Sequence, residues 1–402
     1  MKKLNLLVLL SFVLSISWTA CNSDANNDKT DDAPEIDSLT QDSINKTNFM
    51  AQYNRYFNDV ARFMAGLPQT EGSSIAKIDT FPESIEYRKS NADFFKDLYA
   101  KQISKIEAFS NTELKDIRKE GMTLFYPFSG PDFINSDPFF PEATTTIMFG
   151  LEPVGNVPYL SDKITGEELK KVYKTFRRSI DSIYHLNYFM TNEMSRDLNT
   201  VAQLDGNLSI ISLFMAQRGY RILDVKKVTI NSEGAIVDSI PGWVDIDDPT
   251  DTYISGGLIE YMKPDEYKVR KLYYFSHDVS DEKIAKTPEM LKFFKSLDID
   301  VAFFKAASYL CSWLHTIREF TLENAKNIVQ DDSGIYLKYF EDEKWDKTFY
   351  GKYSRTRKVF KSNFQNDLKA IYDKDTTIKP LDFKFGYGSM IKQDNIMVAR
   401  KK

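Results

Sequence analysis

Apolar side chains recur every three or four residues along much of the chain, which is the spacing that places them on one face of an α-helix. The stretch 46–65 carries its aromatic residues in this way, and we expect it to end before Pro68 and Gly72. The same spacing predicts further helices at 91–108, 112–120, 165–188, 190–203, 208–217, 281–330 and 351–373. Gly219 is expected to cap the buried helix 208–217, because glycine adopts the left-handed conformation at little cost.

Short runs rich in β-branched and aromatic residues predict strands between these helices. They lie at 122–126, 144–149, 220–230, 235–239, 254–262 and 269–275, with a possible strand at 335–340 and an alternating segment at 381–388. Strands and helices occur in blocks rather than in strict alternation, which favours an α+β fold. We therefore expect an antiparallel sheet flanked by several helices, in a single large domain over 46–402.

The first twenty residues have the pattern of a secretory signal. Lys2 and Lys3 precede an apolar run at 4–18, which is shorter than the ~20 residues that a membrane-spanning helix needs. The run leads to Trp18-Thr19-Ala20-Cys21. This resembles the lipobox of bacterial lipoproteins, in which a small residue precedes an obligatory cysteine, and the relaxed form is similar to that of Bacteroidota-type lipoproteins.

The resemblance implies that residues 1–20 are removed and that the sulfur of Cys21 receives a diacylglyceryl group, followed by acylation of the new amino terminus. Two or more acyl chains hold a protein stably at a membrane, at about 0.8 kcal/mol per buried methylene. The membrane is thus an expected partner through the lipid anchor. The alternative is a cysteine that only happens to follow an ordinary signal.

Residues 21–45 are predicted to be a flexible, solvated tether. They carry seven acidic residues against Lys29 alone and almost no large apolar side chains, so they bury too little surface to offset the entropy of ordering. Acidic residues directly behind the cysteine resemble the surface-export signal of Bacteroidota-type lipoproteins; a plain acidic spacer is the alternative. Position 22 is Asn rather than the Asp of the enteric retention signal, so we expect an outer-membrane lipoprotein that faces the periplasm or the surface.

Charge and cysteine content narrow the possible partners. The net charge of −5 becomes −7 once Lys2 and Lys3 are removed with the signal, which argues against nucleic acid as a partner. Aromatic residues make up 14% of the chain and supply ample material for a core. With Cys21 lipidated, Cys311 has no partner for a disulfide, and its apolar surroundings predict a buried core residue.

The segment 127–143, PFSGPDFINSDPFFPEA, is an unusually long irregular connection, and such connections are often functional. As a recognition loop it would bind a ligand through Ser129, Asp132, Phe139 and Phe140. In the alternative interpretation its prolines fix the loop and its phenylalanines fill the core beneath it.

Five residues are candidates for catalysis. Glu152 follows a predicted strand between Gly150 and Gly155, and Asp132 lies in the loop just described. Asp331 and Asp332 adjoin Ser333 and Gly334, where they either bind a cation, share a proton or simply form the turn. His277 ends a predicted strand beside Asp278, whereas His185 and His315 are expected to be structural.

No motif in the sequence indicates a cofactor or a metal. Phosphate-loop, Gly-x-Ser-x-Gly and His-Glu-x-x-His patterns are missing. The acidic cluster Asp245, Asp247, Asp248 and Asp251 suits calcium electrostatically but lacks the calcium-loop spacing, so a solvated acidic loop is the other interpretation.

The phrases PFSGPDF, GLEPVG and QDDSG resemble those of an uncharacterised family of exported Bacteroidota-type proteins, a resemblance that implies no activity. The leading hypothesis is a binding or envelope-associated module that contacts an unknown protein or small-molecule ligand through 127–155. The alternatives are a carboxylate-dependent hydrolase in the periplasm or at the cell surface, and a structural part of an envelope complex.

Overall fold

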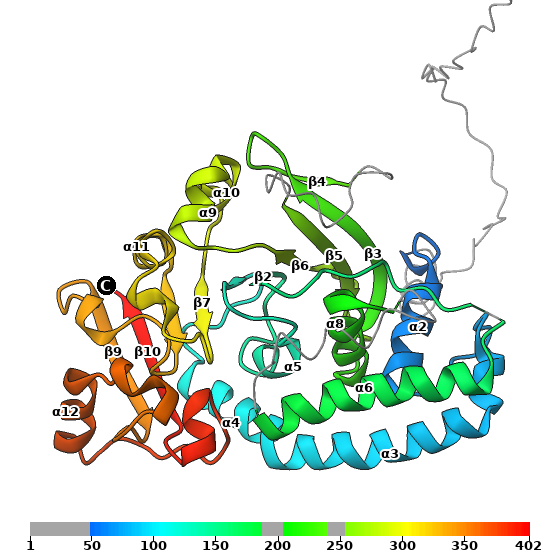
Figure 1. Ribbon diagram of the computed structural model, residues 1–402, viewed down its shortest axis with the longest axis horizontal. Coiled ribbons are helices and arrows are strands. Elements are labelled where there is room, and N and C mark those ends of the chain that lie inside the picture. Colours follow the sequence, from blue (N-terminus) through cyan, green and yellow to red (C-terminus); the bar gives the residue numbers. More distant parts are fainter. Residues whose placement is uncertain (1–48, 162, 187–203, 240–253) are drawn as a thin grey trace, which may run out of the picture. The chain divides into compact units, whose positions relative to one another are not determined.

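One ten-stranded sheet organises the protein (Figure 1). The structure is a computed structural model, and it describes residues 49–161, 163–186, 204–239 and 254–402. The strand order is β4-β3-β5-β6-β2-β1-β7-β8-β10-β9. The strands are β1 (Thr123–Tyr126), β2 (Thr145–Gly150), β3 (Arg221–Ile230), β4 (Ile236–Asp238), β5 (Ser255–Met262), β6 (Arg270–Ser276), β7 (Val301–Phe304), β8 (Asn327–Gln330), β9 (Trp345–Gly351) and β10 (Asn395–Lys401).

The sheet is mixed. Its five central strands, β6-β2-β1-β7-β8, pair in parallel, and the strands beyond them at both ends pair antiparallel. The α+β class and the single large domain are therefore confirmed, whereas antiparallel pairing holds only for the two ends. Parallel neighbours need long crossover connections, usually with helices, and the connections between these strands do contain helices.

Two of the parallel strands lie inside 281–330, which the apolar spacing predicted to be helical throughout. All four residues of β7 are buried, as are three of the four in β8. A strand that is covered on both faces loses the apolar–polar alternation that marks an exposed strand. The segments 335–340 and 381–388 are not strands, and the antiparallel pair β9 and β10 was not predicted.

The helices match the predictions best where their apolar face is longest. They are α2 (Arg55–Ala65), α3 (Pro82–Leu98), α4 (Ser104–Glu113), α5 (Phe133–Ser136), α6 (Gly166–Leu186), α8 (Gly206–Gln217), α9 (Asp281–Lys286), α10 (Pro288–Lys295), α11 (His315–Asn324) and α12 (Asn366–Lys374). The helices predicted at 165–188 and 208–217 are confirmed. The helix predicted at 112–120 is wrong, because turns follow the end of α4. The range 190–203 lies outside the described residues.

The ends of two helices show how glycine shapes the fold. Gly66 adopts a left-handed conformation with φ 67° and ends α2 after Ala65, where the predicted helix 46–65 also ends. Gly219, with φ 83°, follows the last turn of α8 as expected, and its N–H donates to the carbonyl oxygen of Ala216. No helix among the described residues is both long and apolar enough to cross a membrane.

Helices cover both faces of the sheet (Figure 1). Successive side chains of a strand point to opposite faces. Phe303 of β7 accordingly belongs to the core cluster that includes residues of α2, α3, α4, α5, α6 and α8, while Phe304 belongs to the cluster that includes residues of α9, α10 and α11. In β1 the alternation continues, with Tyr126 on the first face and Phe125 on the second. The parallel strands are thus covered on both faces, and their carboxyl ends are where a ligand can approach the sheet.

Candidate functional site

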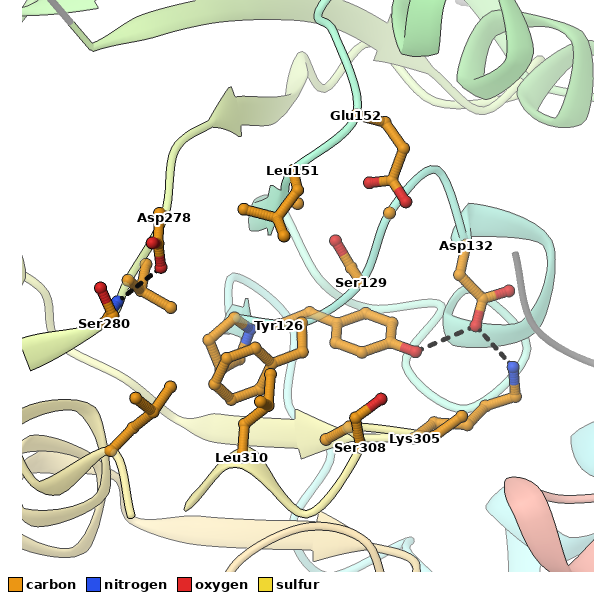
Figure 2. Close-up of a pocket in the computed structure, with 18 of the residues that line it drawn as sticks. Tyr126, Ser129, Asp132, Leu151, Glu152, Asp278, Ser280, Lys305, Ser308 and Leu310 are labelled. Carbon is orange, nitrogen blue, oxygen red and sulfur yellow. Dashed lines mark hydrogen bonds and ion pairs between the residues drawn. The ribbon is translucent and has the colours of Figure 1, made fainter. Parts of the chain in front are cut away.

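A pocket of about 340 Å³ opens at the carboxyl ends of the central parallel strands (Figure 2). The loops that follow β1, β2, β6 and β7 line it. Strands β1 and β7 are neighbours, but the chain continues from them in opposite directions along the sheet. From β1 it passes to β2, toward one edge, and from β7 it passes to β8, toward the other edge. Their loops therefore diverge and leave a crevice, which is the place where open sheets of this kind bind ligands.

A buried ion pair lies at one side of this pocket. Lys305, the first residue after β7, places its Nζ 2.7 Å from Oδ2 of Asp132, and the two side chains are 1% and 2% exposed. The hydroxyl of Tyr126, the last residue of β1, donates to the same oxygen at 3.0 Å. The amide of Asn135 donates to Oδ1 at 2.6 Å. Burial, together with the charge of Asp132, raises the pKa of Tyr126 well above its usual value.

These contacts limit the chemical role of Asp132. Both of its carboxylate oxygens accept hydrogen bonds, and a cation lies against one of them. A buried pair of this kind is costly to desolvate, and it persists because its geometry and its additional hydrogen bonds offset that cost. Asp132 therefore supplies a fixed polar surface to the pocket rather than a free general base.

Glu152 also lines the pocket and is almost fully buried (Figure 2). The hydroxyl of Tyr274 donates to its carbonyl oxygen at 2.9 Å and lies 3.4 Å from Oε2. The carboxylate packs against the backbone of Gly130 and Gly150; a Cβ added at Gly150 would lie 2.5 Å from Oε2. The glycine noted in the sequence at position 150 is thus required by the close approach of this carboxylate.

His277 also lines the pocket, but Asp278 does not activate it. The carboxylate of Asp278 accepts a hydrogen bond from the backbone N–H of Ser280 at 2.8 Å, while Nε2 of His277 lies 3.3 Å from the hydroxyl oxygen of Thr287. Burial lowers the pKa of His277, so its imidazole is neutral at pH 7. The arrangement gives the pocket a neutral polar group rather than a histidine–aspartate pair.

Asp331 and Asp332 lie behind the wall of this pocket, at the end of β8, and do not line it. The N–H and hydroxyl of Ser333 donate to Oδ1 of Asp331 at 3.1 and 2.5 Å, so the two acids do form the predicted turn. Oδ2 of Asp331 accepts from the N–H groups of Ala306 and Tyr387 at 3.3 and 3.2 Å. Its carboxylate thereby links two loops that do line the pocket.

Asp332 is held by side chains instead. The hydroxyl of Tyr309 donates to its Oδ2 at 2.5 Å, and the amide of Asn395 donates to its Oδ1 at 2.9 Å. No lysine, arginine or histidine of the described residues forms an ion pair with either acid. Burial and the neighbouring charge of Asp332 raise the pKa of Asp331 to about 7, and burial raises that of Asp332.

The remaining candidates lie elsewhere. Phe139 and Phe140 are fully buried and pack against Phe303, so they are core residues rather than ligand contacts. The 127–143 segment therefore has two parts. Its phenylalanines pack in the core, and its first residues line the pocket. There Ser129 lines the pocket, with its hydroxyl donating to the carbonyl oxygen of Phe149 at 3.0 Å.

Cys311 is a buried free cysteine as predicted, and burial raises the pKa of its thiol. His315 begins α11 and does not line the pocket. Three other predictions fall outside the described residues: lipidation at Cys21, the acidic cluster 245–251 and the side chain of His185. Within the described part of the chain, no three His, Cys, Asp or Glu side chains gather as a metal site requires.

The sequence reasoning missed Lys305, Ser308 and Tyr387, all of which line the pocket. The sequence could have marked Lys305 as a candidate, because it is a single charge inside an apolar run. Ser308 and Tyr387 had none, since 79 residues separate two hydroxyls that lie 2.7 Å apart.

A second cavity of about 330 Å³ lies near the first. Leu98, Gln102, Phe383 and Asp394 are among its lining residues. Asn135 lines it as well, and the same side chain donates to Asp132 of the first pocket. One buried amide thus lies between the two cavities.

No family model matches the chain, and neither curated proteins nor solved structures give a match. The fold and the pocket together define an α+β protein with a pocket at the carboxyl ends of its parallel strands.

Proposed function

We propose that this chain is a membrane-anchored exported lipoprotein whose folded body binds a small molecule in the pocket between the ends of β1 and β7. The observation that carries the proposal is the placement of the pocket at the point where the connections of two adjacent parallel strands diverge. A pocket of about 340 Å³ falls within the usual range for small-molecule sites.

The lining indicates the kind of molecule. One side is polar, with Asp132, Lys305 and Glu152 fixed in buried positions. The rim carries two large apolar side chains that stay in water, Leu151 at 66% exposure and Trp313 at 56%. Binding a ligand would remove this apolar surface from water, which favours association. We expect a ligand with one polar group and an apolar body.

The same contacts weigh against the carboxylate-dependent hydrolase. That mechanism needs acids that converge on one pocket with a free acid or base among them. Asp132 is occupied by Lys305, and Asp331 and Asp332 lie behind the wall. Of the candidate acids, only Asp132 and Glu152 line the pocket, and Asp132 is already paired with Lys305.

The membrane location rests on the first 45 residues of the sequence. Ala20-Cys21 provides the lipidation signal, and the acidic tether behind it is suited to display on the outer membrane. Mass spectrometry of the protein from a lipoprotein-processing host should find a lipid-modified Cys21 as the first residue. A Cys21→Ala variant should leave the membrane fraction; an unmodified thiol in the unaltered chain contradicts the anchor.

Ligand binding is tested by the thermal shift of the protein against a library of small amphiphiles. A ligand at ~100 times its Kd should stabilise the native state by about 2.7 kcal/mol. Leu310 lines the pocket, so Leu310→Trp should fill it and abolish the shift. Val359→Trp places the same side chain at a position that is 72% exposed and should keep the shift. Shifts that persist in Leu310→Trp, or none at all, contradict this pocket.

A further inference from the structure

Backbone strain is concentrated in the two loops that close one side of the pocket. Only four non-glycine residues in the described part of the chain have a left-handed backbone, and three of them are Ala306, Ser308 and Tyr309, with φ between 53° and 59°. The fourth, Lys392, caps the short helical turn Tyr387–Ile391. Such conformations persist only where surrounding contacts enforce them, and they cluster at functional sites.

The end of β8 supplies the enforcing contacts. Asp331 accepts from the N–H of Ala306 in one loop and of Tyr387 in the other. The hydroxyl oxygen of Ser333 accepts from the N–H of Ala307 at 2.8 Å, and its carbonyl oxygen accepts from the N–H of Tyr309 at 3.0 Å. The phrase QDDSG, which the sequence had marked out, is thus the element that fixes both loops against each other.

The side chains placed by this arrangement are Ser308 and Tyr387. Their hydroxyl oxygens lie 2.7 Å apart, and both residues line the pocket. Figure 2 shows Ser308 reaching into the pocket from the loop after β7. A serine with positive φ just after a central strand presents its hydroxyl to the ligand, as in the sharp turns that carry nucleophilic serines in hydrolases, although the Gly-x-Ser-x-Gly pattern is missing here.

We propose that Ser308 is a nucleophile toward a carboxylic ester bound in this pocket and that Tyr387 relays its proton. The inference rests on the proposed function, because the ester occupies the same pocket as the ligand. Leu310, Trp313 and Leu314 follow Ser308 in the chain and line the pocket beside it. The acyl group is therefore apolar and short enough for the available volume.

The proton and electron balance needs no further reagent. The Oγ atom of Ser308 bonds to the ester carbonyl carbon, its proton passes to the phenol oxygen of Tyr387, and the phenol proton passes to the departing alkoxide as the ester C–O bond breaks. An alcohol leaves, and Ser308 carries the acyl group. Water then attacks the acyl carbon, and the reverse relay returns a proton to Oγ as the carboxylic acid departs.

Hydrolysis of p-nitrophenyl acetate, butyrate and octanoate by the full chain tests the proposal, together with mass-spectrometric mapping of a fluorophosphonate probe. We expect nitrophenolate release and a single adduct on Ser308. Ser308→Ala should abolish the adduct and lower kcat/KM on the order of 10³-fold or more. Tyr387→Phe should lower kcat by about 10²-fold, the usual contribution of a proton-transfer group.

Ser312→Ala is the matched control. Ser312 follows in the same loop but does not line the pocket, and its hydroxyl donates to the carbonyl oxygen of Tyr309. This variant should keep both hydrolysis and labelling. Ser308→Ala should fold, because alanine already holds the same left-handed conformation at Ala306; an unchanged thermal midpoint checks this.

The outcomes separate this inference from ligand binding. Equal hydrolysis by the unaltered chain and Ser308→Ala, with no adduct on Ser308, overturns the nucleophile. If amphiphiles still shift the thermal midpoint in that case, binding stands and catalysis fails. An adduct on Ser308 in a protein that no library compound stabilises would support the nucleophile and contradict the binding function.

Discussion

Two clusters of buried carboxylate lie at the same edge of the sheet and are stabilised in different ways. At the ends of β1 and β7, Asp132 has a lysine in direct contact. At the end of β8, Asp331 has only N–H and hydroxyl groups around it, with a second carboxylate, Asp332, next in the chain. One cluster carries balanced charges, and the other carries an excess of negative charge that dipoles must stabilise.

The two clusters therefore have different roles at this edge of the sheet. A buried carboxylate in direct contact with a cation suits a fixed pocket wall. A carboxylate held by dipoles is stabilised only while every donor keeps its place, so Asp331 ties the geometry of two loops to its own charge state. Burial and the charge of Asp332 raise the pKa of Asp331 to about 7, and the donors around its carboxylate oppose that rise.

The largest expected effect comes from breaking the balanced cluster. Lys305→Met leaves Asp132 buried without its cation, and removal of one partner from such a pair costs about 3–5 kcal/mol. Urea unfolding should show this loss of stability at pH 7. The double variant Lys305→Met/Asp132→Asn should recover much of it, because no isolated charge remains; a double variant no more stable than the single one contradicts a role for the ion pair.

In the cluster at the end of β8, we expect the two neighbouring acids to differ in how much they contribute to stability. Asp331→Asn turns an amide NH₂ toward backbone N–H donors and should cost about 2–4 kcal/mol, since buried donors lose their acceptor. Asp332→Asn should cost less, because the hydroxyl of Tyr309 can accept as well as donate. Unfolding free energies of the two variants check the order, and equal losses would refute this description.

Two glycines provide the next comparison. Gly386 has φ 61°, and a Cβ there would lie 1.7 Å from Oδ2 of Asp331. Gly121 has φ 86° with nothing within 4 Å of its added Cβ. Gly121→Ala should therefore cost only about 1–2 kcal/mol for the left-handed backbone, and Gly386→Ala should cost more. Thermal midpoints that fall equally would show that Gly386 does not pack against Asp331.

The smallest effect concerns pH. Because the pKa of Asp331 rises from 3.8 to about 7 on folding, its contribution to stability is fully present below pH 4 and is lost as the pH rises through 7. Asp332→Asn removes the neighbouring charge and should lower that pKa, so the loss between pH 4 and 7 should shrink by about 1 kcal/mol. An unchanged pH profile of unfolding in this variant contradicts the coupling.

Local patterning predicted about two thirds of the sheet and the longest helix. Helix α6 and strands β1 to β6 follow apolar spacing or β-branched runs, and the structure confirms them. Strands β7 and β8 are buried on both faces and show no alternation. Unlike β1 and β2, which are as buried, they lie inside the range 281–330, whose apolar spacing favoured a helix. Since these two strands lie at the centre of the sheet, the parallel pairing was missed along with them.

The residues of the candidate site also fall into those that the sequence marked and those that it did not. Asp132, Glu152 and His277 follow strands, and the sequence marked all three as candidates; they do line one pocket. Ser308 and Tyr387 come together only because the order β1-β7-β8 brings the end of β8 beneath two distant loops. That proximity depends on long-range strand pairing, which no local pattern encodes.

Crystallographic fragment screening most directly tests the claim that the pocket between the ends of β1 and β7 binds a small molecule, because it shows where such molecules bind. We predict that bound fragments gather between the ends of β1 and β7, with apolar atoms against Leu151 and Trp313 and polar atoms toward Asp132 and Lys305. Fragments that instead gather in the second cavity, against Gln102 and Phe383, or that leave the first pocket empty across the whole screen would contradict the account.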